Sequence, residues 1–224
     1  MRNNVFAGNT AEGTTCASRG GGLYLSLDTN GYLVGNTFHD NSADEGGGVY
    51  LTDLTTAGLY NNIVYANSAP SGADVYFDGV TYRIGYHNDC SDVNRSWTDA
   101  AGNIDVAPVF VDPGTGNYRL DSGSPCIDAG TAAVPDPPGL PDYDIEGYPR
   151  TIGTAPDIGA YEYVGLVLQG DVNGDGRVNV GDITKLERIM LMLDPVTPGA
   201  DVNGDGRLNA ADITKIERIM LQLD

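Results

Sequence analysis

The pattern of apolar and polar positions repeats in the first part of the chain. Short apolar stretches are framed by asparagines in NVFAGNTA from Asn4, NTFHDNSA from Asn36 and NIVYANSA from Asn62. In each copy a glycine-rich link then leads into a tyrosine-containing stretch: GGGLYLSL, GGGVYLTD and GADVYFDG. The copies begin 32 and 26 residues apart, a period typical of solenoids built from stacked coils. The strands are too short for a sandwich, and no helical pattern separates them.

The repeat predicts a mainly β region folded as a parallel β-helix, in which equivalent residues stack coil on coil. We expect the repeated asparagines to take the left-handed conformation at a corner and to hydrogen-bond to the asparagines above and below. Val5, Phe38 and Ile63 are expected to face inward and to stack into one narrow core. From about Ala107 the repeat fades and prolines become frequent, so this region should wrap the end of the solenoid rather than extend it.

Two phrases near the end of this region, SPCIDAG from Ser124 and DIGAYEY from Asp157, strengthen the interpretation. With the repeats, they resemble the C-terminal coils of right-handed parallel β-helix proteins of the pectate-lyase-like superfamily. The resemblance covers about residues 1–163, and we assign residues 1–165 to these coils and their cap. Asn3 already opens a repeat, with no polar cap before it, so we expect this chain to be the C-terminal part of a longer protein.

The end of the chain carries one acidic twelve-residue stretch twice: DVNGDGRVNVGD at 171–182 and DVNGDGRLNAAD at 201–212. Oxygen-bearing side chains at positions one, three, five, nine and twelve, with glycine at six, form the EF-hand-type calcium pattern. Position seven contributes only its backbone carbonyl, and position nine can act through a water. Two copies in one register disfavour a turn without a metal, so the sequence predicts two Ca²⁺ ions. The predicted ligands are Asp171, Asn173, Asp175, Arg177, Asn179, Asp182, Asp201, Asn203, Asp205, Arg207, Asn209 and Asp212.

Each loop runs into a stretch whose apolar residues recur at steps of three and four, as in an amphipathic helix. The first stripe is Ile183, Leu186, Ile189, Met190 and Leu193, and the second is Ile213, Ile216, Ile219, Met220 and Leu223. The aspartate at position twelve falls in the first helical turn, where the helix dipole favours a carboxylate. The eighth residues, Val178 and Leu208, should point inward, and Gly176 and Gly206 should have positive φ. No helix is predicted before either loop, unlike an ordinary EF-hand.

A calcium loop with only an exiting helix, duplicated across a short linker, resembles a type I dockerin over about residues 168–224. We assign residues 166–224 to this small all-α module. The resemblance implies that calcium is required for folding and that the partner is a cohesin domain of a scaffoldin, which anchors the chain to a cellulosome-like complex. Crowded carboxylates that repel one another until cations neutralise them give a physical reason for the calcium requirement.

The resemblance also implies contact positions at loop residues ten and eleven and on the following helix. They are Val180, Gly181, Glu187, Arg188 and Met192 in the first copy and Ala210, Ala211, Glu217, Arg218 and Gln222 in the second. Many members of the family carry a hydroxyl pair and a basic pair there, so the small residues and Glu–Arg pairs leave the identity of the cohesin open. Glu187 and Arg188 also fit an ordinary solvated helix face. The near-identity of the copies predicts a pseudo-twofold module that can dock by either helix.

Charge and composition narrow the partners. The chain carries 31 acidic and 12 basic residues, a net charge of −19, which argues against nucleic acid and against an anionic membrane surface. There is no apolar run of about 18 residues and no signal peptide in this sequence. Abundant glycine, asparagine, threonine and tyrosine is typical of an extracellular β-rich protein. The three cysteines leave at least one thiol unpaired: Cys90 and Cys126 could bridge, or all three could be free thiols.

Whether the β region is an enzyme stays open at this stage. One alternative is an assembly module with polysaccharide binding. The other is a polysaccharide lyase or glycoside hydrolase whose active site lies partly outside this chain. A hydrolase would need a carboxylate pair, and acids on neighbouring turns could be grouped, although solvated turn carboxylates fit them better. Those acids are Asp40, Asp44, Glu45 and Asp53. The spacing reveals no partner for His39 or His87.

Overall fold

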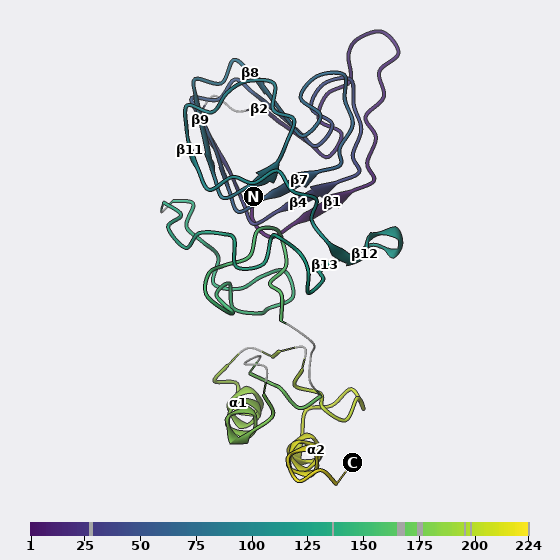
Figure 1. The fold of residues 1–224 in the computed structure, drawn as a ribbon, viewed down its shortest axis with the longest axis vertical. Helices are drawn as coiled ribbons and strands as arrows, with labels where there is room; N and C mark the ends of the chain where they lie inside the picture. The colour runs from purple at the N-terminus through teal and green to yellow at the C-terminus, as the bar shows by residue number, and fades with distance from the viewer. Residues whose placement is uncertain are drawn as a thin grey trace.

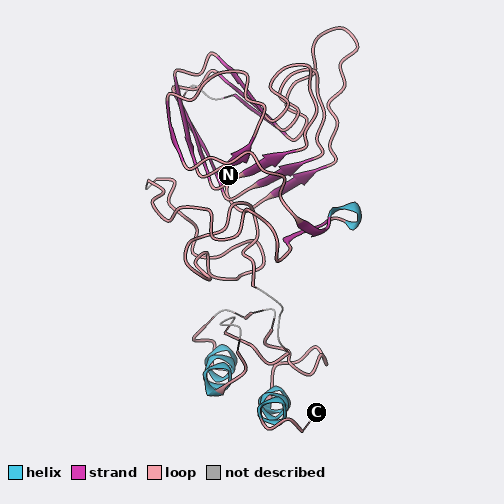
Figure 2. Cartoon of the chain, in the orientation of Figure 1, coloured by secondary structure: helices cyan, strands magenta, loops and turns pink. Residues whose placement is uncertain are grey.

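The computed structural model describes residues 1–26, 29–135, 137–164, 169–173, 177–194, 196–197 and 199–223. Its first part is a stack of coils held together by parallel sheets, and its C-terminal part contains two helices (Figure 1, Figure 2). A mainly β, solenoid-like region followed by a small helical module agrees with the predicted fold class at this level. Within the described ranges, no helix is long and apolar enough to cross a membrane.

Three parallel sheets form the solenoid. Sheet I contains β1 (Val5–Ala7), β4 (Thr37–His39), β7 (Ile63–Tyr65) and β10 (Asp89–Cys90). Sheet II contains β3 (Asn30–Val34), β6 (Thr56–Tyr60), β9 (Tyr82–Tyr86) and β11 (Asp99–Ala101). Sheet III contains β2 (Leu23–Ser26), β5 (Val49–Thr52) and β8 (Val75–Asp78). Neighbouring strands pair in parallel with matched positions, so each residue stacks on its equivalent one coil away.

A ladder of asparagine amides holds the corner before sheet I. Each Nδ2 group donates to the Oδ1 atom of the next asparagine at 2.9–3.0 Å, from Asn4 through Asn36, Asn62 and Asn88 to Asn103. The same Oδ1 atoms accept the backbone N–H of the asparagine before them, as Asn88 does for Asn62 at 3.0 Å. Asn9, Asn41 and Asn67 form a second ladder after the strands. The predicted stacking of asparagines is confirmed.

The left-handed residue at this corner is not the ladder asparagine. Positive φ angles lie instead on the residue before each one: Asn3, Gly35, Asn61, His87 and Gly102. The ladder asparagine directly precedes the strand of sheet I, and its backbone N–H points along the stack to the Oδ1 atom of the next asparagine. The bend is therefore made one residue earlier, and the predicted conformation was assigned to the wrong position.

Of the three residues predicted to stack inward, Phe38 lies in the interior, whereas the prediction was wrong for Val5 and Ile63. The register pairs Phe6 with Phe38 and Phe38 with Val64, and the two phenylalanine rings stack at 4.8 Å. Phe38 and Val64 lie in the interior cluster, which also contains Leu33, Leu51, Leu59 and Phe77. Because side chains alternate across a strand, Val5 and Ile63 point to the outside of sheet I and join a second cluster. The sequence analysis had matched Phe38 with Val5 and Ile63, which are in register with the residue before it, Thr37. Adjacent residues of a strand point to opposite faces of the sheet.

The proline-rich segment covers the outside of the solenoid. It begins with a hairpin of β12 (Phe110–Asp112), the 3₁₀ turn Pro113–Thr115 and β13 (Asn117–Leu120). Phe110, Tyr118 and Ile158 pack with Ile63 on the outer face of sheet I. Val134 packs on Val34 and Tyr60 outside sheet II. As expected the segment does not extend the coils, and these contacts place it on two flanks of the solenoid, outside sheets I and II.

A buried ion pair fixes this covering segment. Nη1 of Arg150 lies 3.0 Å from Oε1 of Glu162, and both side chains are almost wholly buried. Nη2 of Arg150 also donates to the carbonyl of Gly159 at 2.7 Å. Burial and the nearby Asp157 charge raise the pKa of Glu162 to about 8, against the attraction of Arg150. Removing either partner would leave the other uncompensated in the interior.

We predict that N62A destabilises the solenoid by about 2–4 kcal/mol. The Asn62 side chain is fully buried, donates to Asn88 and to the carbonyls of Leu33 and Tyr60, and accepts from Asn36. Alanine cannot form these hydrogen bonds, so the buried donors and acceptors that pair with the Asn62 amide would be left unsatisfied. Chemical denaturation followed by tyrosine fluorescence measures the change, and N30A, at an exposed asparagine, is the control. Equal effects of the two substitutions would contradict the role of the ladder.

We predict that D89N flattens the pH dependence of stability. Asp89 is fully buried, and desolvation raises its pKa to about 6. The folded state therefore binds this proton more tightly than the unfolded chain. The resulting stabilisation is present below the unfolded pKa near 4 and is lost as pH rises through 6. The difference between the wild type and D89N in free energy of unfolding should change by about 3 kcal/mol between pH 3.5 and 7.5. D112N, on the exposed hairpin, should behave as wild type.

Candidate metal centre and partner surface

The two C-terminal helices begin at the loops because the loops supply their caps. Helix α1 (Val180–Met190) has Asn179 as its N-cap, and α2 (Ala210–Met220) has Asn209. Each asparagine oxygen accepts a backbone N–H of the first turn, from Gly181 at 2.7 Å and from Ala211 at 2.9 Å. The aspartate at loop position twelve accepts the N–H of its asparagine in return, which completes a capping box. Loop and helix are thus one structural unit.

The aspartates at position twelve also hold the start of each loop. Oδ1 of Asp182 accepts the N–H groups of Val172 at 2.9 Å and Asn173 at 3.0 Å. In the second copy Oδ1 of Asp212 accepts the N–H of Asn203 at 3.1 Å. Both carboxylates are completely buried. Each one therefore joins the start of its loop, at position three, to the end of the loop at position twelve.

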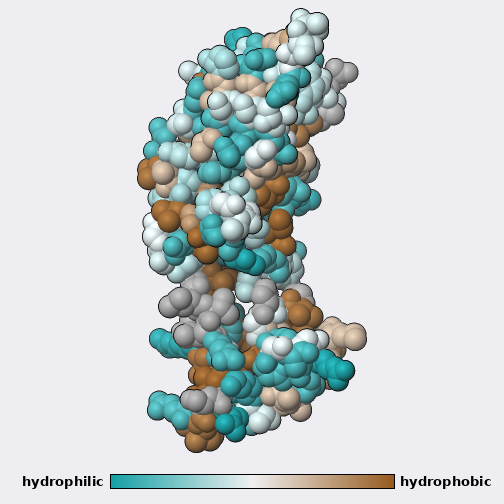
Figure 3. All heavy atoms as spheres, turned by 90° about the vertical axis from the view of Figure 1, so that its right-hand side faces the viewer, coloured by the Kyte–Doolittle hydropathy of each residue, from teal (hydrophilic) through white to brown (hydrophobic). Residues whose placement is uncertain are grey.

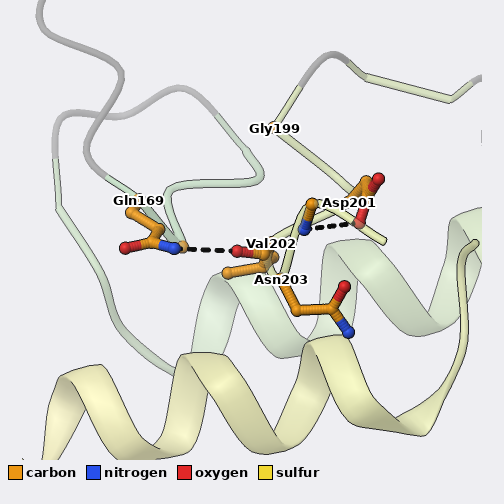
Figure 4. A pocket seen from close by; sticks show the side chains of 7 residues that line it. Gln169, Gly199, Asp201, Val202 and Asn203 are labelled. Atoms are coloured by element: carbon orange, nitrogen blue, oxygen red, sulfur yellow. Dashed lines mark hydrogen bonds between the residues drawn. The ribbon is translucent and has the colours of Figure 1, made fainter. Parts of the chain in front are cut away.

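The second loop is described in full, and it closes around Asp201. The two oxygens of this carboxylate accept the N–H groups of Gly204 at 2.8 Å, Asp205 at 3.1 Å and Gly206 at 2.7 Å. Gly206 has φ +78°, as predicted for the sharp turn at position six. Figure 4 shows Asp201 and Asn203 beside a cavity of about 320 Å³. Beside the same cavity, the side-chain amide of Gln169 donates to the carbonyl of Val202 at 3.0 Å. This bond connects the start of the module to the second loop.

The predicted calcium ligands are placed as follows. Asp171, Asn173, Asn179 and Asp182 lie in the first loop, whereas Asp175 and Gly176 fall outside the described residues. Arg177 and Arg207 are exposed, as expected for residues that would contribute only a carbonyl. Asn179 and Asn209 serve as helix caps, a role that the sequence prediction missed although Asx-x-x-Asp before an apolar stripe signals it. Within the described residues, no three acidic, histidine or cysteine side chains gather in a metal-binding cluster.

The residues nevertheless fit a calcium ion. All the predicted donors are oxygens, and Ca²⁺ prefers six to eight of them. The buried Asp212 carboxylate accepts the backbone N–H groups of Asn203 and Asn209, and no lysine or arginine of the described residues forms an ion pair with it. A bound divalent cation would supply that charge. The chain's own contribution is to close the loop and fix the first turn of the helix.

A shared apolar core joins the two copies. It contains Leu186, Ile189 and Ile216, with Val172, Ala200 and Val202 from the loop starts. Val178 and Leu208 pack against it, as predicted for position eight. The stripes end earlier than expected: Leu193 and Leu223 lie beyond the helices and are 62% and 61% exposed. The reason is that a left-handed residue, Met192 or Gln222, follows each helix and turns the chain away from the core.

Residues 169–221 match the family model described as the dockerin type I domain. These residues form a type I dockerin domain. The match covers the loops, both helices and the Gln169 contact, and leaves the solenoid outside. No curated protein and no solved structure matched the chain. Type I dockerins bind calcium and bind cohesin domains in cellulosomes, which are extracellular.

Most of the implied contact positions of the dockerin are exposed. Val180 is 67% exposed and Met192 is 92% exposed, and Glu187 and Arg188 lie on the outer face of α1. Ala210, Ala211, Glu217, Arg218 and Gln222 are exposed in the second copy, and Gly181 is half-buried. Arg188 forms two bonds of 2.9 Å with Asp194, and Lys185 lies 3.1 Å from the same carboxylate. These two cations lower the pKa of Asp194, first through the hydrogen bond from Arg188.

The sequence prediction missed an exposed apolar group at the end of both helices. Leu191, Leu193, Leu221 and Leu223 are each more than 60% exposed. Figure 3 shows apolar surface on the C-terminal module. The repeated LMLD and LQLD sequences contained the signal, because an apolar residue that follows a helix stop cannot continue the buried stripe.

We predict that a calcium chelator unfolds the dockerin domain and leaves the solenoid folded. When the cation is lost, the negative charge of the buried Asp182 and Asp212 carboxylates is no longer balanced. Each is then repelled by the other carboxylates of its own loop. Far-UV circular dichroism at 222 nm should lose the helical signal and regain it with Ca²⁺, while the thermal transition of the β region persists.

The substitution D201N provides the matched test. It keeps the size of the side chain and removes one charge from the second loop, so Ca²⁺ affinity there should fall at least about tenfold. D112N, with the same change on the exposed hairpin, serves as control. A helical signal that the chelator leaves unchanged would refute the calcium requirement.

Proposed function

We propose that the chain is an extracellular protein whose calcium-loaded dockerin binds a cohesin domain of a scaffoldin and thereby attaches the solenoid to a cellulosome-like complex. The observation that carries this proposal is the family match at 169–221, on a module with two capped loop–helix units. We place the boundary between the modules at 165/166, within residues 165–168, which lie outside the described part of the chain. Two Ca²⁺ ions, one per loop, complete the domain.

The two copies support docking by either helix. Both helices have the same length, the same kind of capping box and a left-handed residue at the equivalent position after the last turn. The contact positions of each copy form an equivalent exposed set, and the shared core lies between them. Turning the module by about half a turn would present α2 in place of α1. The differences at Val180 and Ala210, and at Met192 and Gln222, are the places where the two faces would differ in affinity.

We propose that the solenoid is a right-handed parallel β-helix of the pectate-lyase-like class that binds polysaccharide in this complex. The three parallel sheets, the asparagine ladders and the covering segment support this class. The grouped turn acids give less support to a catalytic role. Asp44 accepts the N–H and Oγ–H of Ser18, Glu45 pairs with Arg19, and Asp53 accepts from Ser26. These carboxylates connect neighbouring coils, so we favour binding and assembly over lyase or hydrolase activity.

We predict that blocking one helix leaves cohesin binding intact and that blocking both abolishes it. Val180 and Ala210 are the exposed first residues of their helices. An aspartate at this position interacts favourably with the helix dipole, so we expect both variants to fold. V180D or A210D alone should change the dissociation constant by less than about threefold, whereas the double variant should weaken binding by more than about 100-fold. Isothermal titration against a panel of type I cohesins in Ca²⁺ measures these values.

The outcomes separate the parts of the proposal. If V180D alone abolishes binding and A210D alone leaves it unchanged, docking uses only the first helix. If the Ca²⁺-loaded wild type binds no type I cohesin, the proposed attachment to a scaffoldin is wrong. Helical circular dichroism of each variant verifies that the loops remain folded.

A further inference from the structure

A cavity of about 540 Å³ lies outside sheet II, between the solenoid and the covering segment. The sheet side is lined by Tyr60 of β6, Tyr86 of β9 and Ala101 of β11, and the covering side by Thr131 and Ala133. Sheet II lies on the left of the solenoid in Figure 1. The cavity is distant in sequence from the dockerin, and the proposed cohesin docking does not use it. Its size is in the range of small-molecule sites.

The cavity sits where a ladder of aromatic rings ends. On the outer face of sheet II, Tyr60 and Tyr86 occupy equivalent positions on successive coils, and their rings stack at 6.0 Å with 5° between the planes. Tyr60 therefore covers one face of Tyr86. The residue in register on the next coil is Ala101, which carries only a methyl group. The space that a further ring would fill beside Tyr86 is left as part of the cavity.

Hydrogen-bonding groups surround this ring position. Asp99 lies next to the Tyr86 hydroxyl, and its hydrogen bond raises the pKa of that phenol. Nδ1 of His87 lies 2.8 Å from the carbonyl of Ala129, which can only accept, so Nδ1 carries the hydrogen. In the neutral ring, Nε2 is then an acceptor. The wall thus presents one carboxylate, one imidazole acceptor and the Thr131 hydroxyl. Among the residues that the structure describes, no lysine or arginine lines it.

We propose that this cavity binds one pyranose ring of a neutral polysaccharide, stacked on the ring ladder at Tyr86. A pyranose has a flat face of C–H groups that packs on an aromatic ring, and hydroxyls around its edge that donate to acceptors such as Asp99 and His87. The ligand is neutral because residues 1–170 carry 21 of the 31 acidic residues and six of the 12 basic ones. A uronic acid would meet this negative charge with no lining cation to pair it.

Adjacent alanines provide a matched pair of variants. Ala133 lines the cavity and Ala132, also exposed, does not. A133W should fill the ring position, whereas A132W adds the same side chain next to it on the surface. D99N preserves the shape of the wall and removes its carboxylate. Two-dimensional NMR of the full chain in Ca²⁺ with cellohexaose, xylohexaose, mannohexaose, hexagalacturonate and indole measures binding directly and needs no cohesin.

We expect at least one neutral hexasaccharide to give saturable shifts in the wild type and A132W. A133W should weaken that binding more than tenfold, and D99N should weaken it severalfold. The proposal is overturned if no neutral hexasaccharide binds, if A133W binds as A132W does, or if hexagalacturonate or indole binds more tightly than every neutral sugar. This inference rests on the proposed polysaccharide binding by the solenoid: if no sugar of the panel binds, both are overturned, whereas a sugar that binds A133W as well as A132W overturns only this site. Because cohesin titration is a separate experiment, failure here leaves the proposed attachment to a scaffoldin standing, and the reverse also holds.

Discussion

The solenoid depends on one constraint, that each coil must return its asparagine to the same corner. Asn36, Asn62 and Asn88 are completely buried, and the two N–H donors and the acceptor of each amide need partners there. Only the asparagine one coil away offers both a donor and an acceptor at the right height. Two steps of 26 residues between them therefore fix the register of sheet I. Sheets II and III keep the same register over the coils that repeat every 26 residues, as from β3 to β6 to β9 and from β2 to β5 to β8.

Stacking in register has consequences on both faces of the sheets. Inside, it places phenylalanine on phenylalanine, and outside sheet III it stacks Tyr24, Tyr50 and Tyr76 at 5.0–5.3 Å. A ladder of equal rings leaves no room between them for a ligand. A ligand site can form where the ladder changes from a large residue to a small one, as it does from Tyr86 to Ala101. The same regularity that builds the solenoid thus determines where its outer face is hollow.

The sequence allowed the repeats, the parallel stacking and the duplicated module with its two helices to be predicted, because each rests on residues that recur at a fixed spacing. It failed where the answer depended on a single position. Phe38 and Ile63 are two steps and one step after their asparagines, and one residue reverses the face on which a side chain lies. The burial of Ile63 arises from Ile158 and Phe110, which join it from more than 45 residues away and carry no periodic signal. The cavity likewise depends on residues 131–135 lying outside sheet II.

The ends of the two helices connect stability to partner binding. Met192 and Gln222 both have left-handed backbones, at φ +57° and +55°, in the position that glycine usually fills after a helix. The N–H of Leu193 bonds back to the carbonyl of Arg188 at 2.9 Å, and Leu223 does the same with Arg218, so the turn itself is regular. A non-glycine residue there costs about 1 kcal/mol, yet the Met192 side chain is 92% exposed and packs little against its own domain. A side chain that strains its own helix end without helping the core supports a role at the cohesin surface, next to the exposed leucines of the same turn.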